Sequence, residues 1–104
     1  MTATYVENAR DILRGELQVA GKGNQETAFE HGYLILAMTK GEHATLSDVH
    51  DVWSVVRMVN RPWHADIVPF DVLDSTTRHG IEEYDAPILT AIHKTGKRLA
   101  AGGI

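Results

Sequence analysis

Apolar residues recur at helical spacing in the first fifth of the chain. Placed about 100° apart, as the residues of an α-helix are, they form one continuous stripe. The members of this stripe are Val6, Ala9, Leu13, Leu17 and Ala20. The flexible segment Gly21–Gly23 interrupts the pattern directly afterwards. The spacing therefore predicts a helix over residues 6–20 that buries one face.

A second apolar segment follows and is denser than the first. Asn24 can cap it, because an asparagine side chain accepts hydrogen bonds from the free N–H groups of a first helical turn. Most positions between Phe29 and Met38 are apolar, and Gly41 is a typical helix stop. We expect a helix over residues 25–40 that is buried on much of its circumference and lies at the centre of the fold.

The third segment starts with a capping signal. Thr45 is followed three residues later by Asp48, and in this arrangement each side chain satisfies a free backbone N–H group of the other residue. The helix that it opens is expected to end at Asn60, because Pro62 disfavours helical geometry in the residue before it. Four valines form the core stripe of this helix. They are Val49, Val52, Val56 and Val59.

The remaining chain predicts a short irregular connection and then the last helix. Residues 63–73 carry no periodic pattern and leave room for one helical turn near their end. Asp74 to Thr77 offer several cap oxygens, and a short helix is expected behind them over residues 78–83. Asp85 and Pro87 then form a start signal, an acidic cap with proline in the first turn, for a helix that runs to Ala100. No stretch alternates like a strand, so the predicted fold class is all-α with four principal helices.

Length and composition narrow the class of protein. The chain has 104 residues, 43% hydrophobic and 23% charged, so residues 1–104 are expected to form a single globular domain. No apolar run approaches the roughly 18 residues of a membrane span, and no signal peptide opens the chain. The absence of cysteine excludes disulfides, and these features together lead us to expect a cytoplasmic protein. A net charge of −4 argues against nucleic acid as a partner.

The third predicted helix carries the most informative side chains. His50, Trp53 and Arg57 fall on a second stripe, about 100° around the helix from the valines. An indole is a good platform for a planar heterocycle, since stacking of a base on an aromatic ring contributes about 1–3 kcal/mol. An arginine one turn further on can hold a phosphate with paired donors. The alternative is packing, with the guanidinium of Arg57 over a half-buried Trp53, and spacing leaves both interpretations open.

Four short motifs, in this order, resemble the RyR domain, the small helical repeat named after the ryanodine receptor. They are Val49-His-Asp-Val-Trp53, then Arg57 four residues on, Trp63 to Phe70 with Leu73, and Glu83-Tyr-Asp85 ahead of a helix. The resemblance covers residues 45–94. The arm that follows the family's second tryptophan is almost absent, and Ala65 replaces a motif proline. This shortened form resembles small proteins of actinobacterial phages and their hosts.

The resemblance implies non-enzymatic binding of a nucleotide-derived small molecule, without a cofactor. It gives Trp53 the base-stacking role, and His50 and Arg57 can supply hydrogen bonds or phosphate contacts. Trp63 and His64, near the family's second tryptophan, complete the candidate set. A phage origin would suggest sequestration of a host immune signalling nucleotide. Tandem RyR repeats meet around one ligand, so a lone domain is expected to form a homodimer.

Other functions compete with ligand binding. A protein-interaction module would dock a host or phage protein through a surface made by Trp53, Met58 and Trp63. A small hydrolase is the weakest alternative, because no acid–base pair with a defined spacing is visible. The six histidines lack metal-ligand spacing, so no metal is expected. Val55 and Met58 make the third helix apolar almost all round, which also favours a dimer.

Overall fold

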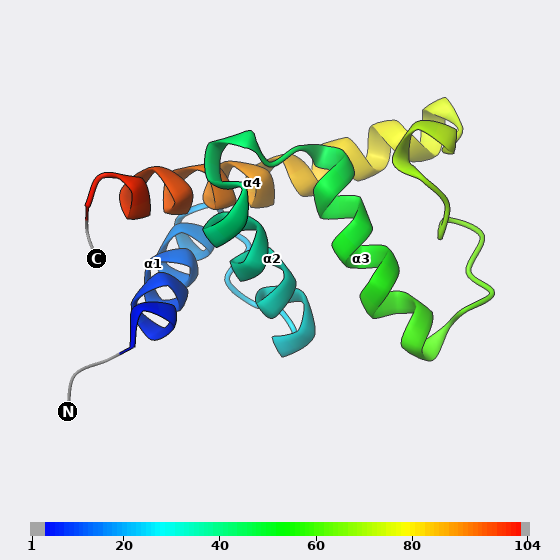
Figure 1. Cartoon of the computed structure of the whole chain (residues 1–104). Coiled ribbons are helices and arrows are strands. Elements are labelled where there is room, and N and C mark those ends of the chain that lie inside the picture. The colour runs from blue at the N-terminus through cyan, green and yellow to red at the C-terminus, as the bar shows by residue number, and fades with distance from the viewer. Residues whose placement is uncertain (1–3, 103–104) are drawn as a thin grey trace.

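The computed structural model describes residues 4–102, and all regular structure in that range is helical (Figure 1). These residues form four α-helices and no strand, which confirms the predicted all-α fold. The helices are α1 (Tyr5–Val19), α2 (Thr27–Thr39), α3 (Leu46–Asn60) and α4 (Ser75–Ala100). Two single turns of 3₁₀-helix, η1 (Gly41–His43) and η2 (Phe70–Val72), lie in the connections.

Helix α4 runs along most of the length of the molecule. Its 26 residues extend about 39 Å at a rise of about 1.5 Å each, in a molecule whose longest dimension is 45 Å. In Figure 1, α1 and α2 lie under the C-terminal half of α4, and α3 descends from its N-terminal half. Helix α2 stands between α1 and α3 and is the predicted central helix. The connection from α3 to α4 forms an open loop beside the N-terminal half of α4.

The apolar core lies where α1, α2 and the C-terminal half of α4 meet. Leu13 and Leu17 of α1 and Ile88 and Ile92 of α4 are almost completely buried. The members of each pair are four residues apart, which places them on one face of their helix. Burying such a side chain contributes about 1.5–3 kcal/mol, so these two stripes fix how α1 and α4 face each other.

A contact between two glycines closes the fold at the same end. Gly41 of η1 has a φ of +54°, which favours glycine, and it lies against Gly96 of α4. A Cβ atom on Gly96 would fall 2.3 Å from the Cα atom of Gly41, so a larger residue there would force the backbones apart. Nearby, the Nε2–H group of His93 donates a hydrogen bond to the carbonyl oxygen of Ala44 (2.7 Å). Close packing and this bond hold η1 on α4.

The capping box predicted at the start of α3 is confirmed. The hydroxyl of Thr45 accepts from the backbone N–H of Asp48 (3.2 Å), and the carboxylate of Asp48 accepts from the backbone N–H of Thr45 (2.9 Å). Lys40 donates a further hydrogen bond to this carboxylate (2.7 Å). Although burial acts to raise the pKa of Asp48, these hydrogen bonds hold it below its ordinary value. Helix α3 therefore starts at a well-defined residue.

Helix α4 corrects the prediction for the end of the chain. Residues 75–100 form one helix, so the separate short helix over residues 78–83 and the second start at Asp85 are both wrong. The helix begins instead after Asp74, whose carboxylate accepts hydrogen bonds from the backbone N–H of Thr77 (2.8 Å) and from its hydroxyl (2.9 Å). The cap at Asp74 is thus the only start signal that this helix uses.

Pro87 lies inside α4, where the sequence places a first turn. A proline in a helix removes its own N–H donor and leaves the carbonyl four residues earlier, here that of Glu83, without its partner. Glu83 is an exposed residue, so water can reach this carbonyl group. The buried face that continues beyond Pro87, beginning with Ile88, outweighs the loss of one hydrogen bond.

Two smaller predictions are also wrong. Asn24 does not cap α2, which starts at Thr27 without a side-chain hydrogen bond at its N-terminus. The sequence places Val59 in the core, but 77% of its surface is exposed. The reason is the register of α2 and α3, which run antiparallel with Val52 against Gly32. Val59 is two turns beyond Val52, past the point where α2 begins.

Candidate functional site

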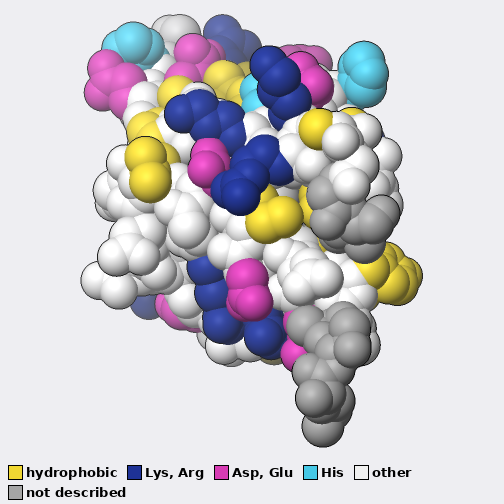
Figure 2. Space-filling model, turned by 90° about the vertical axis from the view of Figure 1, so that its left-hand side faces the viewer, with side chains coloured by type: hydrophobic (Ala, Val, Ile, Leu, Met, Phe, Trp, Pro, Cys, Tyr) yellow, Lys and Arg dark blue, Asp and Glu magenta, His cyan; other side chains and the backbone are white. Residues whose placement is uncertain are grey.

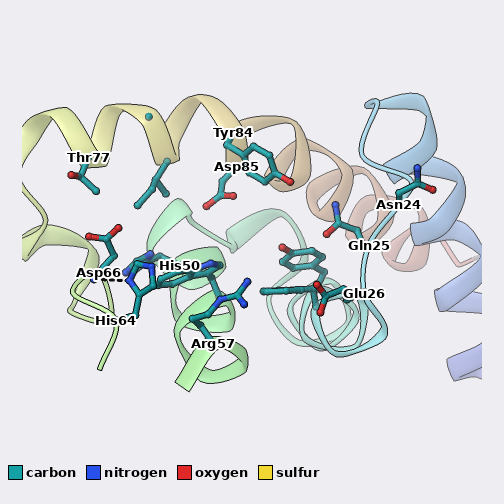
Figure 3. A pocket seen from close by; sticks show the side chains of 15 residues that line it. Asn24, Gln25, Glu26, His50, Arg57, His64, Asp66, Thr77, Tyr84 and Asp85 are labelled. Carbon is teal, nitrogen blue, oxygen red and sulfur yellow. Dashed lines mark hydrogen bonds between the residues drawn. The ribbon is translucent and has the colours of Figure 1, made fainter. Parts of the chain in front are cut away.

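A pocket of about 510 Å³ opens between α3, the N-terminal half of α4 and the segment that leads into α2. This volume lies in the range of small-molecule sites. Figure 3 shows polar side chains reaching into the space from α3 on one side and α4 on the other. The lining residues are Asn24, Gln25, Glu26, Phe29, Tyr33, His50, Trp53, Arg57, His64, Asp66, Thr77, Gly80, Ile81, Tyr84 and Asp85.

The pocket brings together four of the five binding residues predicted from the sequence. His50, Trp53 and Arg57 come from one face of α3, and His64 comes from the loop that follows it. Trp63 does not line the pocket, and 78% of its surface is exposed to solvent. Helical spacing therefore located the α3 wall, because residues three and four apart share a face.

The aromatic wall is built around the indole of Trp53. The imidazole of His50 stacks on the indole, with ring centroids 5.5 Å apart and ring planes 18° apart. The imidazole of His64 meets the indole at 86°, with centroids 5.0 Å apart. Trp53 is partly buried and also packs against the apolar core. Trp53 therefore has both roles that the sequence offers as alternatives. It packs against the core, and it forms part of the pocket wall.

His50 anchors the connection between α3 and α4. The residue is only 1% exposed, and its Nε2–H group donates a hydrogen bond to the carbonyl oxygen of Val68 (2.8 Å). Because a carbonyl oxygen only accepts, Nε2 carries the hydrogen of this bond. The ring of Phe70 packs against the same imidazole, with centroids 5.9 Å apart. His50 therefore holds residues 68–70 on α3.

His64 is oriented by its own loop. The backbone N–H of Asp66 donates a hydrogen bond to Nδ1 of His64 (3.1 Å), drawn as the dashed line in Figure 3. Nδ1 is therefore an acceptor, and Nε2 is the ring nitrogen that can donate to a ligand. The carboxylate of Asp66 lies beside this imidazole, below Thr77 of α4. This end of the pocket thus offers one aromatic donor and one carboxylate.

Arg57 is the only lysine or arginine in the pocket wall. Its guanidinium carbon lies 6.0 Å from the centroid of the Trp53 ring and 5.9 Å from the centroid of the Phe29 ring. None of the ion pairs formed within residues 4–102 involves Arg57. Since a guanidinium has five N–H donors and no acceptor, Arg57 is free to receive a phosphate or a carboxylate group.

Asp85 reaches into the same space from α4, on the side opposite Arg57 (Figure 3). The residue is 8% exposed, and no side-chain hydrogen bond found within residues 4–102 ends on its carboxylate. Burial raises the pKa of Asp85 to about 6, an effect that the neighbouring His50 and Lys22 partly offset. Buried titratable groups of this kind concentrate in functional sites.

Sequence reasoning missed Asp85 because it treats the residue as a helix cap. A signal was nevertheless present. Asp85 precedes Ile88 and Ile92 by three and seven residues, so an acidic residue stands on the apolar stripe of a helix. A carboxylate in such a position is expected only when it has a partner or a function.

The end of the molecule opposite the pocket carries basic and acidic side chains together. In Figure 2, which views the end where both termini lie, lysine and arginine side chains stand next to acidic ones. One such pair joins Arg98 of α4 to Glu16 of α1 at 3.6 Å.

Across residues 4–102, no helix has the length and apolar character that crossing a membrane requires.

Comparison with known proteins identifies a family. Residues 4–97 match a family model described as a domain of unknown function (DUF7701). No curated protein and no solved structure matches the chain. The resemblance to the RyR domain over residues 45–94 is therefore wrong, because the matching family is a different one and spans nearly the whole chain. The phage origin and the sequestration role rested on that resemblance and are withdrawn with it.

Proposed function

The chain belongs to the DUF7701 family, and from the geometry of its pocket we propose that it binds a nucleotide-derived small molecule without converting it. One observation carries this proposal. Aromatic rings and an unpaired guanidinium line the same 510 Å³ pocket, as recognition of a planar base and an anionic group requires. The proposal rests on these side chains and not on the RyR resemblance.

The position of Arg57 indicates how such a ligand would fit. Its guanidinium lies over the indole of Trp53 and is held there by rings alone. A base that enters can take this place on the indole while Arg57 turns to the phosphate. The Nε2–H group of His64 borders the same position and supplies a further donor.

The lining supports binding rather than catalysis by a nucleophile. It contains no serine, cysteine or lysine, and Thr77 carries its only aliphatic hydroxyl. That hydroxyl donates a hydrogen bond to Asp74 (2.9 Å) as part of the cap of α4. A hydroxyl that is held in a helix cap in this way serves the fold and is not directed at a ligand for attack.

Isothermal titration of the full chain with nucleoside monophosphates, cyclic nucleotides and ADP-ribose tests the proposal. We expect saturable binding of at least one of them, weakened about tenfold or more in Arg57→Ala by loss of a charge-assisted contact. Trp63→Ala is the matched control, since Trp63 is exposed and outside the pocket. Heat signals that do not saturate at millimolar concentration for any of these compounds would contradict the proposal.

A second candidate is the homodimer, which one observation favours. Large apolar side chains are exposed side by side on α2 and α3, where a shallow apolar groove runs between the helices. Ile35 and Val55 line this groove, and Met58 and Val59 are exposed one turn further along α3. Such a surface supports pairing with a second copy of the chain. The expected protein-interaction role would use this surface together with Trp63 rather than Trp53, which is part of the pocket.

Sedimentation equilibrium separates the two arrangements. The dimer predicts a mass of twice 11.5 kDa at tens of micromolar and a monomer in Val55→Asp. Val19→Asp, on the exposed end of α1 away from this surface, is the control. A monomer at every concentration would contradict the dimer.

A cytoplasmic location is a further proposal, which fractionation of cells tests.

A further inference from the structure

Asp85 lies in the pocket but takes no part in base stacking on Trp53 or in phosphate binding by Arg57. It belongs to the buried stripe of α4, yet it carries a charge in place of an apolar side chain. The carboxylate is directed into the pocket in Figure 3, with Arg57 on the far side of the space. No ion pair joins the two groups. A ligand between them would meet an acceptor on α4 and donors on α3.

The surroundings of Asp85 offset the effect of its burial only in part. Three other elements bring titratable groups to it: Lys22 in the loop after α1, Tyr33 of α2 and His50 of α3. The ammonium group of Lys22 lies over the ring of Tyr84, 3.6 Å from its centroid. Nε2 of His50 is taken by Val68. Both oxygens of Asp85 are therefore left for a group that enters the pocket.

We propose that Asp85 determines which base the pocket accepts, and that it selects a purine edge with two adjacent N–H donors, the N1–H and 2-amino groups of guanine. This inference rests on the proposed function. A carboxylate has two acceptor oxygens and no donor, so it pairs with two parallel N–H groups. Adenine would instead present the lone pair of N1 to the carboxylate, which is repulsive.

The placement of Asp85 and Arg57 fits a guanine nucleotide as a whole. With the base edge on α4 and the plane of the base on Trp53, the phosphate points away from α4, towards Arg57 on α3. The other carboxylates of the lining, Glu26 and Asp66, lie at opposite ends of the pocket and keep a phosphate away from them. Arg57 is then the one lining residue that attracts it.

Isothermal titration of the full chain at pH 7.5 with guanosine, inosine, adenosine and xanthosine 5′-monophosphates tests this assignment. Inosine lacks the 2-amino group, so we expect it to bind about tenfold or more weakly than guanosine, and adenosine weaker still. Asp85→Asn exchanges one acceptor oxygen for a donor at the same size. Since xanthine has an acceptor where guanine has its amino group, this variant should prefer the xanthosine nucleotide over the guanosine nucleotide.

Asp71→Asn is the matched control, because Asp71 is exposed in η2 and outside the pocket, and it should retain the guanine preference. Equal affinities for the guanosine and adenosine nucleotides, unchanged in Asp85→Asn, would overturn the role of Asp85 while leaving nucleotide binding intact. Absence of binding for all four nucleotides would overturn the role of Asp85 together with the nucleotide part of the proposed function. Melting curves of both variants show that each one is folded.

Discussion

The two halves of α4 share one helix and differ in nearly everything else. From Ile88 onwards the helix buries a stripe of apolar and small residues against α1, α2 and η1. From Ser75 to Tyr84 it buries no residue and forms the roof of the pocket. Asp85 stands at the boundary and is the buried charge of the helix. One continuous helix can therefore stabilise the bundle with one half and shape a binding site with the other.

The difference shows what each half of α4 contributes. In the C-terminal half, every contact that removes apolar surface from water stabilises the fold. At the boundary with the N-terminal half, the carboxylate of Asp85 is buried without a hydrogen-bonding partner within residues 4–102, which costs stability and is of use to something that binds there. Substitutions in the two halves of α4, and in the α3 wall that faces the pocket, should therefore differ in the size and sign of their effects.

Ile92→Ala should have the largest effect. The side chain is fully buried, and its truncation leaves a cavity that costs about 2–5 kcal/mol of unfolding free energy. Ile81→Ala, in the pocket half, should cost less than about 1.5 kcal/mol, because Ile81 is only partly buried. Urea unfolding followed by circular dichroism measures both. Equal losses would show that the pocket half is as tightly packed as the core.

Asp85→Asn should stabilise the fold at neutral pH. The carboxyl group has a pKa of 3.8 when unfolded and about 6 when folded, so the folded state holds the proton more tightly. Stability is therefore highest below about pH 4 and falls as the pH rises towards 6, by roughly 3 kcal/mol at most. The asparagine amide does not ionise, so the variant does not lose this stability as the pH rises.

The melting temperature of Asp85→Asn should accordingly exceed that of the unchanged chain at pH 7.5 and approach it at pH 4. A variant that melts lower than the unchanged chain at pH 7.5 would mean that the carboxylate has a partner in the folded protein. Asp71→Asn again serves as the control, because Asp71 is exposed and should change the melting temperature little at either pH.

Gly96→Ala and Gly80→Ala apply one substitution to both halves of α4. At position 96 the added Cβ atom would lie 2.3 Å from the Cα atom of Gly41, so we expect a loss of about 1–3 kcal/mol. At position 80 a Cβ atom meets nothing within 4 Å, and alanine is the better helix former by about 1 kcal/mol. The two variants should shift the melting temperature in opposite directions. Shifts of the same sign would contradict the proposed difference in packing between the two halves of α4.

Arg57→Ala should have the smallest effect on folding. The side chain forms no ion pair within residues 4–102, and its contacts with the Trp53 and Phe29 rings contribute about 0.5–1 kcal/mol each at most. Thermal melting measures this. A loss of several kcal/mol would make Arg57 a structural residue of the bundle rather than a free donor for the ligand.

Much of the fold could be predicted from the sequence because it depends on local patterns. Apolar spacing located α1, α2 and α3, and the capping box at Thr45 fixed the start of α3. The helix start predicted at Asp85 is wrong because contacts between helices, and not a local pattern, decide the structure there. Asp85 and Pro87 form a local start signal, but burial of Ile88 and Ile92 against α1 and α2 keeps the helix continuous. Propensity gives way to tertiary packing there.

The candidate site was predictable only where a single helix supplies it. His50, Trp53 and Arg57 are related by helical spacing, so their shared face follows from the chain alone. Asp85 and Tyr84 meet them only because α4 crosses over α3, which local spacing does not determine. Trp63 shows the converse, since it is close to the site in sequence but points to solvent.

The indole N–H signals in a nitrogen–proton correlation spectrum test the central claim most directly. The chain has two tryptophans, Trp53 in the pocket and Trp63 outside it, and Trp63→Phe assigns their two signals. Addition of guanosine 5′-monophosphate should shift the Trp53 signal in a saturable manner and leave that of Trp63 in place. A Trp53 signal that stays unmoved at millimolar nucleotide, or a shift of Trp63 alone, would contradict a nucleotide site between α3 and α4.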